Sequence, residues 1–337
     1  MRVGTVCYCT EQGIGYLPKW FYDAGVITDV VLYHHSSRTN RREWYPPDTP
    51  YLAVRNLTQN DAVEDMVNAV DALLFFETPF DWDILKLAHE YGKRTYIVPM
   101  YECTPKHIPV EPTRWLCPSL LDQRDYFPGN PFLQIPVPPD TVWKRRTTAR
   151  CFLHNGGHLG LHGHKGTLEI MRAMEHVKSS VNLTIAVQDE QGFEKLLRQV
   201  PGVANDDRVA IVRRGRHHDS LFAYGDVFVM AEKYNGLSLP LIEAWASGMC
   251  VVTSDRFPMN TWLPQKPLIP VTSYTTTHIS GAYMEFSEAT ISPENIAAKI
   301  DELYGADISE YSEQGRAFAE ANSWDKLKPV WMEELSK

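Results

Sequence analysis

Residues 235–254 read NGLSLPLIEAWASGMCVVTS and carry the strongest fold information in the chain. A glycine-bearing loop leads into an apolar stretch in which Pro240 is tolerable only in the first helical turn, so a helix is expected to begin near Ser238 or Leu239. The glycine that follows ends this helix, and the apolar run 249–254 predicts a buried parallel strand. The order of loop, helix, glycine and strand is typical of a parallel α/β domain.

The start of this predicted helix has the chemistry of an anion-binding site. Ser238 is a good N-cap residue, and the free backbone N–H groups of the loop and first turn, together with the helix dipole, attract a phosphate. Glu243 lies about one turn further on, where a carboxylate could accept hydrogen bonds from two hydroxyl groups of a ribose. The segment therefore predicts a binding site for a nucleotide.

Short apolar runs alternate with helical periodicity along the rest of the chain, which predicts two doubly wound α/β halves with parallel sheets. In the first half we expect strands at residues 3–9, 29–34, 71–76, 94–98, 114–117 and 132–135. In the second half we expect strands at residues 151–154, 182–187, 209–212, 227–230 and 250–254. Ligands of such folds bind outside the carboxyl ends of the strands, so a site is expected in a cleft between the halves.

The boundary between the halves is expected in the proline-rich stretch 136–150, because prolines cannot join a central sheet. The charged run from Lys144 to Arg146 is interpreted as solvated. We therefore expect an N-terminal domain at 1–140, a linker at 141–150, a C-terminal domain at 151–323 and a last helical segment at 324–337.

Composition narrows the class of protein and its compartment. A chain of 337 residues favours two domains, and a net charge of −9 argues against a protein that mainly grips nucleic acid or anionic lipid. The six cysteines are scattered without a CxxC pair, which favours a reducing compartment. The N-terminus shows no signal-peptide pattern and the chain no apolar run long enough for a transmembrane segment, so a cytoplasmic location is expected.

A second informative segment lies at the start of the second half. Residues 152–157 (FLHNGG) predict a strand that runs into a glycine loop, and Lys165 and Gly166 precede the next helix. Together with residues 235–248, this arrangement resembles the signature of the family-four retaining glycosyltransferases. The resemblance implies a GT-B fold with two Rossmann-like domains, an interdomain cleft and a last helix that crosses back to the N-terminal domain.

The resemblance also implies a nucleotide-sugar donor, expected to be a UDP- or GDP-sugar, in the C-terminal domain. Lys165 corresponds to the lysine that neutralises the donor diphosphate and stabilises the leaving group. Glu243 corresponds to the acid that binds the ribose, and Asn235 stands where the family has an acid that holds the donor sugar. The expected donor-binding residues are Asn155, Gly156, Gly157, Lys165, Arg213, Asn235, Gly236, Leu237, Ser238, Leu239 and Glu243.

The N-terminal half is expected to bind the acceptor. Where the family has a histidine that contacts the transferred sugar, this chain has Phe76 followed by Glu77. Glu77 and Glu102 both follow predicted strands, and either could orient the acceptor hydroxyl. The expected catalytic residues are Lys165, Asn235, Glu77 and Glu102. The implied reaction is transfer with retention, without a metal or another cofactor.

Some residues admit a second interpretation. His158, His162 and His164 could bind a metal, but no fourth ligand has matching spacing, so no metal is expected. The basic and aromatic stretch 38–45 leaves open a phage-type glycosyltransferase that acts on hydroxylated bases of DNA, although nucleic acid is not the favoured partner. Asn235 leaves open a non-catalytic nucleotide-sugar-binding protein. The acceptor (a glycan, a lipid or a small molecule) and the oligomeric state stay open.

Overall fold

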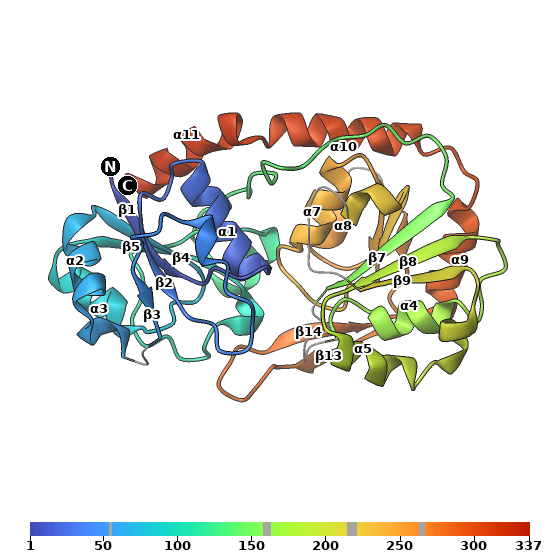
Figure 1. Ribbon diagram of the computed structural model, residues 1–337, viewed down its shortest axis with the longest axis horizontal. Coiled ribbons are helices and arrows are strands. Elements are labelled where there is room, and N and C mark those ends of the chain that lie inside the picture. Colours follow the sequence, from blue (N-terminus) through green and yellow to red (C-terminus); the bar gives the residue numbers. More distant parts are fainter. Residues whose placement is uncertain (54–55, 158–162, 214–220, 263–266) are drawn as a thin grey trace. The chain divides into compact units, whose positions relative to one another are not determined.

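A computed structural model of the chain describes residues 1–53, 56–157, 163–213, 221–262 and 267–337. The chain divides into two compact units (Figure 1). Unit 1 comprises Met1–Pro136, His278–Glu285 and Ser323–Lys337. Unit 2 comprises Val137–Thr277 and Phe286–Asn322.

Unit 1 is built on a parallel sheet with the strand order β3-β2-β1-β4-β5-β6. Its strands are β1 (Val3–Cys7), β2 (Asp29–Tyr33), β3 (Tyr51–Leu52), β4 (Ala72–Glu77), β5 (Arg94–Pro99) and β6 (Arg114–Trp115). Its α-helices are α1 (Gly13–Asp23), α2 (Asp61–Ala69), α3 (Asp83–Glu90) and α11 (Trp324–Leu335). Short 3₁₀ turns lie at Arg42–Trp44, Leu57–Gln59 and Tyr101–Cys103, and a π-helical turn lies at Asp122–Tyr126.

Unit 2 repeats the scheme with the strand order β12-β11-β10-β7-β8-β9, again all parallel. Its strands are β7 (Cys151–Gly157), β8 (Asn182–Val187), β9 (Val209–Arg213), β10 (Val227–Met230), β11 (Cys250–Ser254) and β12 (Leu268–Ile269). Its α-helices are α4 (Thr167–Ala173), α5 (Glu190–Leu197), α7 (Leu239–Ala246), α8 (Met259–Trp262), α9 (Pro293–Leu303) and α10 (Ser309–Ala321). Two 3₁₀ turns (Pro201–Asn205 and Phe222–Tyr224) and an antiparallel pair, β13 (Ser273–Thr277) with β14 (Phe286–Thr290), complete it.

The predicted fold class, two doubly wound α/β halves, is confirmed by the two six-stranded sheets. One expected strand, at residues 132–135, is wrong: Phe132 forms a single isolated bridge with Cys117. Pro131 and Pro136 flank this segment and offer no N–H group, so a ladder cannot extend along it. In the described part of the chain, no helix has both the length and the apolar character needed to cross a bilayer.

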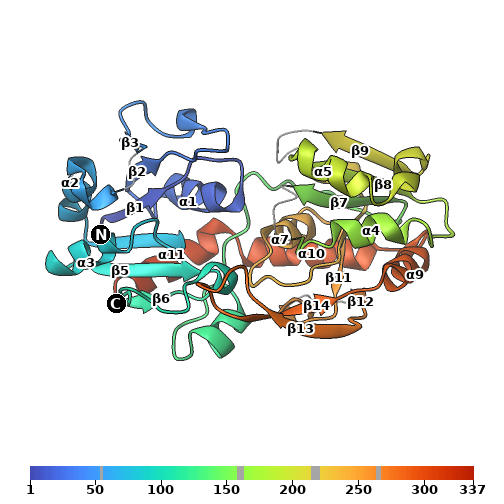
Figure 2. The same ribbon diagram turned by 90° about the horizontal axis from the view of Figure 1, so that it is seen from below.

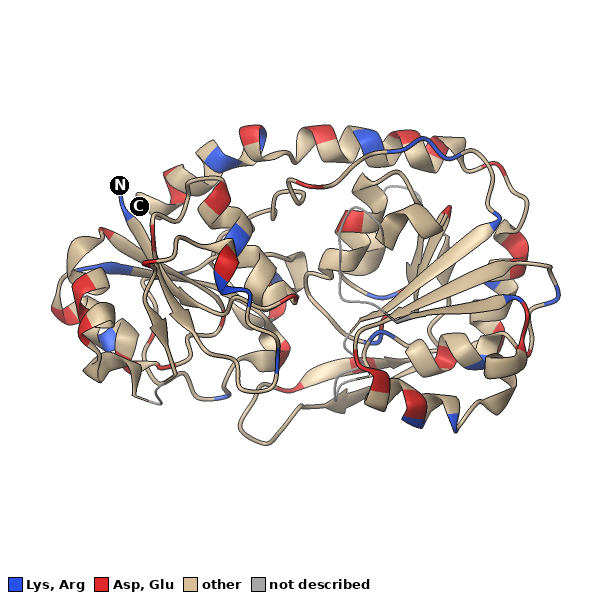
Figure 3. Ribbon diagram, in the orientation of Figure 1, with Lys and Arg blue, Asp and Glu red and all other residues tan. Residues whose placement is uncertain are grey.

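Alternation along the central strands of unit 2 builds two separate cores. In β7, Phe152 packs in one cluster with residues of α4, α5 and α9, whereas Leu153 packs in another with residues of α7. The views in Figures 1 and 2 show α4 and α9 on one face of this sheet and α7 and α10 on the other. The sequences of β7, β8 and β10 contain no Lys, Arg, Asp or Glu, whereas charged residues line the outer helices (Figure 3).

Helices α7 and α10 approach each other unusually closely. A Cβ atom on Gly315 of α10 would lie 2.1 Å from the carbonyl oxygen of Trp245 in α7, so only glycine permits this crossing. The ring of Trp245 stacks on that of Phe318, with 4.4 Å between their centroids. The crossing leaves almost every residue of α7 buried, which fixes the helix start that the sequence identified as a binding element.

The expected solvated run at residues 144–146 is wrong for one of its three residues. Lys144 and Arg145 are exposed, but Arg146 is buried. Its guanidinium donates hydrogen bonds to the carbonyl oxygens of Gly225 (2.8 Å), Phe222 (2.7 Å), Lys144 (2.9 Å) and Ser247. A guanidinium carries five N–H donors, so these carbonyls compensate for its loss of water and tie the stretch to unit 2.

Two C-terminal segments pack in unit 1. In the segment 278–285, the N–H of Met284 donates to the carbonyl of Thr104 (3.0 Å), and the carbonyl of Ala282 accepts from the N–H of Lys106 (2.8 Å). In α11, the indole N–H of Trp331 donates to the carbonyl of Gln134 (3.0 Å). The sequence analysis placed the segment 278–285 in the C-terminal domain, because local patterns do not reveal such pairing across the chain.

Candidate functional site

The glycine loop at the end of β7 brings three polar side chains together. Gly157 has a φ of +55°, and a Cβ atom at this position would lie 2.6 Å from the Lys165 Nζ, 3.4 Å from the Asn155 Oδ1 and 3.9 Å from the Gln188 Oε1. The lysine ammonium therefore lies directly over the glycine backbone, with two amide side chains beside it. Asn155, Gly157 and Lys165 were predicted from the sequence, whereas Gln188 was not.

The lysine is held in this place by the glycine that follows it. Gly166 has a φ of +66°, and a Cβ atom there would lie 2.2 Å from the carbonyl oxygen of Ala231, just after β10. The carbonyl of His164 accepts a hydrogen bond from the N–H of Lys233 (2.6 Å). The turn that carries Lys165 is thus packed against the carboxyl end of β10.

A buried histidine, His154, supports the same turn. Its Nδ1 lies 2.9 Å from the carbonyl oxygen of Val229 and its Nε2 lies 2.8 Å from the Thr167 Oγ1. The Nδ1–H must donate to the carbonyl, so Nε2 accepts from the hydroxyl group at the start of α4. Burial lowers the pKa of His154 to about 4, and the nearby charge of Lys165 lowers it further, so the ring is neutral.

The loop before α7 differs from its predicted form. Ser238 has a φ of +48°, in the left-handed region, and its side chain does not cap the helix. The Oδ1 of Asn235 instead accepts hydrogen bonds from the N–H groups of Leu237 (3.0 Å) and Ser238 (3.1 Å). The prediction that Ser238 is the capping side chain is therefore wrong, and two of the loop N–H groups are already used within the loop.

The ribose candidate Glu243 lies one turn into α7, as its spacing predicts. Its side chain is fully buried. The neighbouring Gly236, Leu237 and Leu239 are also buried. Contact between Glu243 and a ribose stays a prediction.

Sequence reasoning missed Glu232, which follows β10 directly. Its side chain is fully buried, and neither carboxylate oxygen has a hydrogen-bond partner of ordinary geometry among the described residues. Burial raises the pKa of Glu232 to about 7, and the charge of Arg256, the side chains of Ser238 and Asn235, and the charge of Lys165 each lower it. A carboxylate directly after the apolar run 227–231 was the available signal.

In unit 1, the two acceptor candidates lie at one edge of the sheet. Glu77 ends β4 with a φ of +65°, and burial raises the pKa of its carboxyl group to about 7. Glu102 is buried in the turn after β5. Burial raises the pKa of the Cys103 thiol, and the charges of Glu77 and Glu102 raise it further, so both carboxylates lie near this cysteine.

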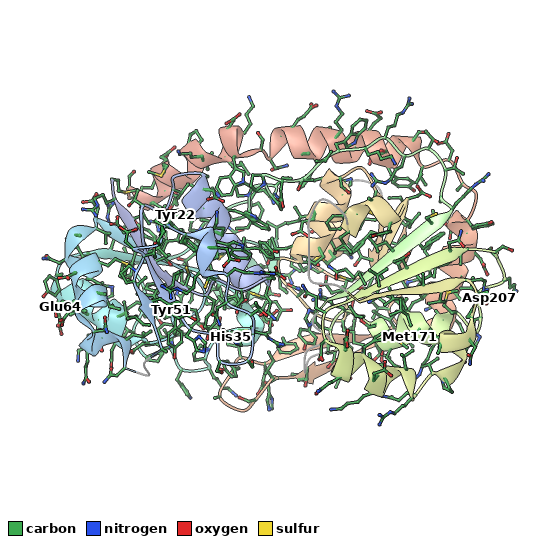
Figure 4. All side chains as sticks on the ribbon, viewed as in Figure 1. Tyr22, His35, Tyr51, Glu64, Met171 and Asp207 are labelled. Atoms are coloured by element: carbon green, nitrogen blue, oxygen red, sulfur yellow. The ribbon has the colours of Figure 1, made fainter. Side chains whose placement is uncertain are left out.

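Other predicted groups have structural roles or lie outside the described residues. The Nε of Arg41 donates to the Glu11 Oε1 at 2.8 Å, and the Arg42 guanidinium lies 4.5 Å from the ring centroid of Tyr51, a residue labelled in Figure 4. The structure does not describe the side chain of Arg213, nor Arg214, His158 and His162. Among the described residues, no group of three histidine, cysteine or acidic side chains is arranged to hold a metal ion.

The two parallel sheets and the lysine–glycine site define the class of the fold, which is that of the GT-B glycosyltransferases. Residues 155–263, which carry this site, match the family model described as Glycosyl transferases group 1. No curated protein matches the sequence.

Solved structures agree with this fold over the full length of the chain. HepE from Anabaena in complex with UDP-glucose has a TM-score of 0.68 at 10% identity, covering 100% of this chain and 99% of its own. A glycosyltransferase from Rickettsia africae has a TM-score of 0.66 at 11% identity, covering 100% and 98%. Sucrose-phosphate synthase from Thermosynechococcus elongatus has a TM-score of 0.63 at 13% identity, covering 100% and 98%.

Proposed function

We propose that the chain is a retaining glycosyltransferase that transfers a sugar from a UDP- or GDP-sugar to an acceptor hydroxyl. The observation that carries the proposal is the position of the Lys165 ammonium over Gly157, beside Asn155. A lysine and a glycine loop at the end of a central parallel strand suit a diphosphate. The match of residues 155–263 to a glycosyltransferase family and the UDP-glucose bound to HepE support this donor class.

In this proposal the donor binds to unit 2. Lys165, Asn155 and the backbone of Gly156 and Gly157 hold the diphosphate, together with loop N–H groups from Gly236 to Leu239 that Asn235 does not use. Glu243 holds the ribose, and Arg213 lies at the strand end that faces the nucleobase. Asn235 shapes the loop beside the donor sugar through its two hydrogen bonds.

The proposed chemistry needs no residue that forms a covalent bond with the sugar. The acceptor oxygen attacks the anomeric carbon from the face on which the diphosphate leaves. The bond between that carbon and the phosphate oxygen breaks, the new glycosidic bond forms, and the hydroxyl proton passes to the departing phosphate oxygen. Lys165 stabilises the negative charge that develops on the diphosphate, so the proposal includes no resident metal.

The acceptor is assigned to unit 1, with Glu77 and Glu102 as the groups that orient its hydroxyl. Glu77 supports this role because a non-glycine residue in the left-handed region is strained by about 1–3 kcal/mol, and such strain clusters at functional sites. Its carboxyl group can also exchange a proton near neutral pH, because burial raises its pKa to about 7.

Substitution of Lys165 tests the donor site. We expect Lys165→Ala to lower kcat for release of UDP or GDP by about 10²–10³-fold, because one stabilising charge is lost from the transition state. Lys195→Ala, an exposed lysine of α5 in the same unit, is the matched control and should keep full activity. Unchanged turnover in Lys165→Ala would reject the assignment. Binding of nucleotide-sugars without any release by the wild-type chain would instead identify a binding protein.

Two measurements address the finer parts of the proposal. The anomeric configuration of the product, read by NMR before it mutarotates or is processed, should match that of the donor, and an inverted product would exclude retention. Turnover should persist after dialysis against EDTA, whereas a loss that Mg²⁺ or Mn²⁺ restores would contradict metal independence.

A further inference from the structure

We infer that Glu232, and not Asn235, provides the carboxylate that accepts hydrogen bonds from hydroxyl groups of the donor sugar. The inference rests on the proposed function, because it assigns the sugar part of the same donor site. It adds a residue that the sequence pattern did not single out.

The first argument is the position of Glu232 beside the proposed diphosphate site. It follows Ala231, whose carbonyl lies against Gly166, and the charge of Lys165 acts on its carboxyl group. Lys165 therefore neighbours both the backbone of Gly157 and the Glu232 side chain. Because a donor sugar is bonded directly to its diphosphate, a carboxylate beside this lysine lies within reach of the sugar.

The second argument is that Asn235 has little acceptor capacity left. Its Oδ1 already accepts from the N–H groups of Leu237 and Ser238, and its carbonyl oxygen accepts from the Arg256 Nη1 at 3.1 Å. The remaining amide NH₂ can only donate. A sugar hydroxyl that donates its proton must find its acceptor elsewhere in this loop.

The third argument is the unsatisfied state of Glu232 itself. Both of its oxygens are buried, and in the part of the chain that the structure describes neither accepts a hydrogen bond of ordinary geometry. A buried carboxylate without partners is strongly unfavourable, and burial accordingly raises its pKa to about 7. Two hydroxyl donors would satisfy its oxygens and favour the ionised form, which could then stabilise positive charge at the anomeric carbon.

The competing interpretation makes Glu232 a counter-ion for Arg256. The Arg256 guanidinium does act on the Glu232 carboxyl group, but its hydrogen bond goes to the backbone of Asn235. A counter-ion role predicts a loss of stability on substitution without a change in sugar discrimination. The two interpretations therefore differ in a measurable quantity.

The test compares wild type with Glu232→Gln on UDP-glucose, UDP-galactose, UDP-N-acetylglucosamine and GDP-mannose, and on monodeoxy analogues of whichever donor is used. Wild type should lose about 10- to 100-fold in kcat/KM when the hydroxyl that Glu232 binds is absent, as expected for a hydrogen bond to a charged group. Glu232→Gln should be slower on the parent donor and discriminate less than 3-fold against the deoxy analogue. Inhibition by sugar-free UDP or GDP should change less than 3-fold.

Two results would overturn the inference: a variant that discriminates as wild type does, or one that binds sugar-free nucleotide as poorly as the donor. If Glu232→Gln does not fold, Glu232→Asp is measured in the same way, because it keeps the charge and shifts the carboxylate. Wild-type protein that neither binds nor uses any of the four donors would count against the proposed function itself. Restoration of discrimination by Asn235→Asp in the Glu232→Gln background would further support a requirement for a carboxylate here.

Discussion

The ammonium group of Lys165 lies over the backbone of Gly157, so close that a Cβ atom on the glycine would be 2.6 Å from the nitrogen. The two residues come from different elements, the end of β7 and the turn before α4. Their contact depends on the absence of a side chain at position 157. The geometry of the anion site can therefore be tested without touching the lysine.

Gly157→Ala should displace the Lys165 ammonium, because the new methyl group occupies its place and the φ of +55° disfavours any L side chain. We expect kcat/KM for the donor to fall about 10-fold or more, with a loss of stability of about 1 kcal/mol. Gly305→Ala is the control: its φ is +80°, but a Cβ there meets nothing within 4 Å, so it reports backbone strain alone. Equal activity in the two variants would contradict the contact.

His154 should make the stability of unit 2 depend on pH below neutrality. Its folded-state pKa is about 4, below the ordinary value of 6.5, so the unfolded chain takes up the proton first and the fold loses stability as pH falls from 6.5 towards 4. His154→Gln should cost stability at pH 7 through lost hydrogen bonds. Between pH 7 and pH 5 this cost should shrink by about 2 kcal/mol in urea unfolding. A difference that does not depend on pH would contradict a neutral buried ring.

Asp122 should show the opposite sign. Burial raises the pKa of its carboxyl group to about 7, although the hydroxyl of Ser119 donates to it. The folded state therefore binds the proton more tightly than the unfolded chain, and stability is lost as pH rises towards 7. Asp122→Asn should be about as stable as wild type at pH 5 and more stable by about 1–2 kcal/mol at pH 8. Urea unfolding at the two pH values measures this, and lower stability at pH 8 would refute it.

Arg146 should be required for the stability of unit 2. Its guanidinium donates to carbonyls of Gly225, Phe222 and Ser247, which belong to separate segments of the unit. Arg146→Lys keeps the charge but cannot reach all of these acceptors, so we expect a loss of about 2–4 kcal/mol in unfolding free energy. Arg145→Lys, next in the chain but exposed, should change stability by less than about 0.5 kcal/mol. Similar losses in both variants would show that the buried network contributes little.

Most of the fold could be predicted from the sequence because its signals are local. Continuous apolar runs marked the central strands of both sheets, and the glycine stops between them marked the ends of helices. The exception at residues 132–135 shows the limit of an apolar run as a signal, since flanking prolines left Phe132 with a single bridge. The charged run before β7 failed in a similar way, because burial of Arg146 depends on carbonyls about 80 and 100 positions away.

The sequence by itself determined two parallel α/β halves and the segments that carry the site, since periodicity and glycine positions fix local structure. Only the tertiary structure decided which polar groups meet there. It placed Lys165 over Gly157, gave the Asn235 oxygen to the loop backbone and brought Glu232 beside the lysine. Residues 165 and 232 are joined by the pairing of β7 with β10, a long-range contact that no local pattern of residues encodes.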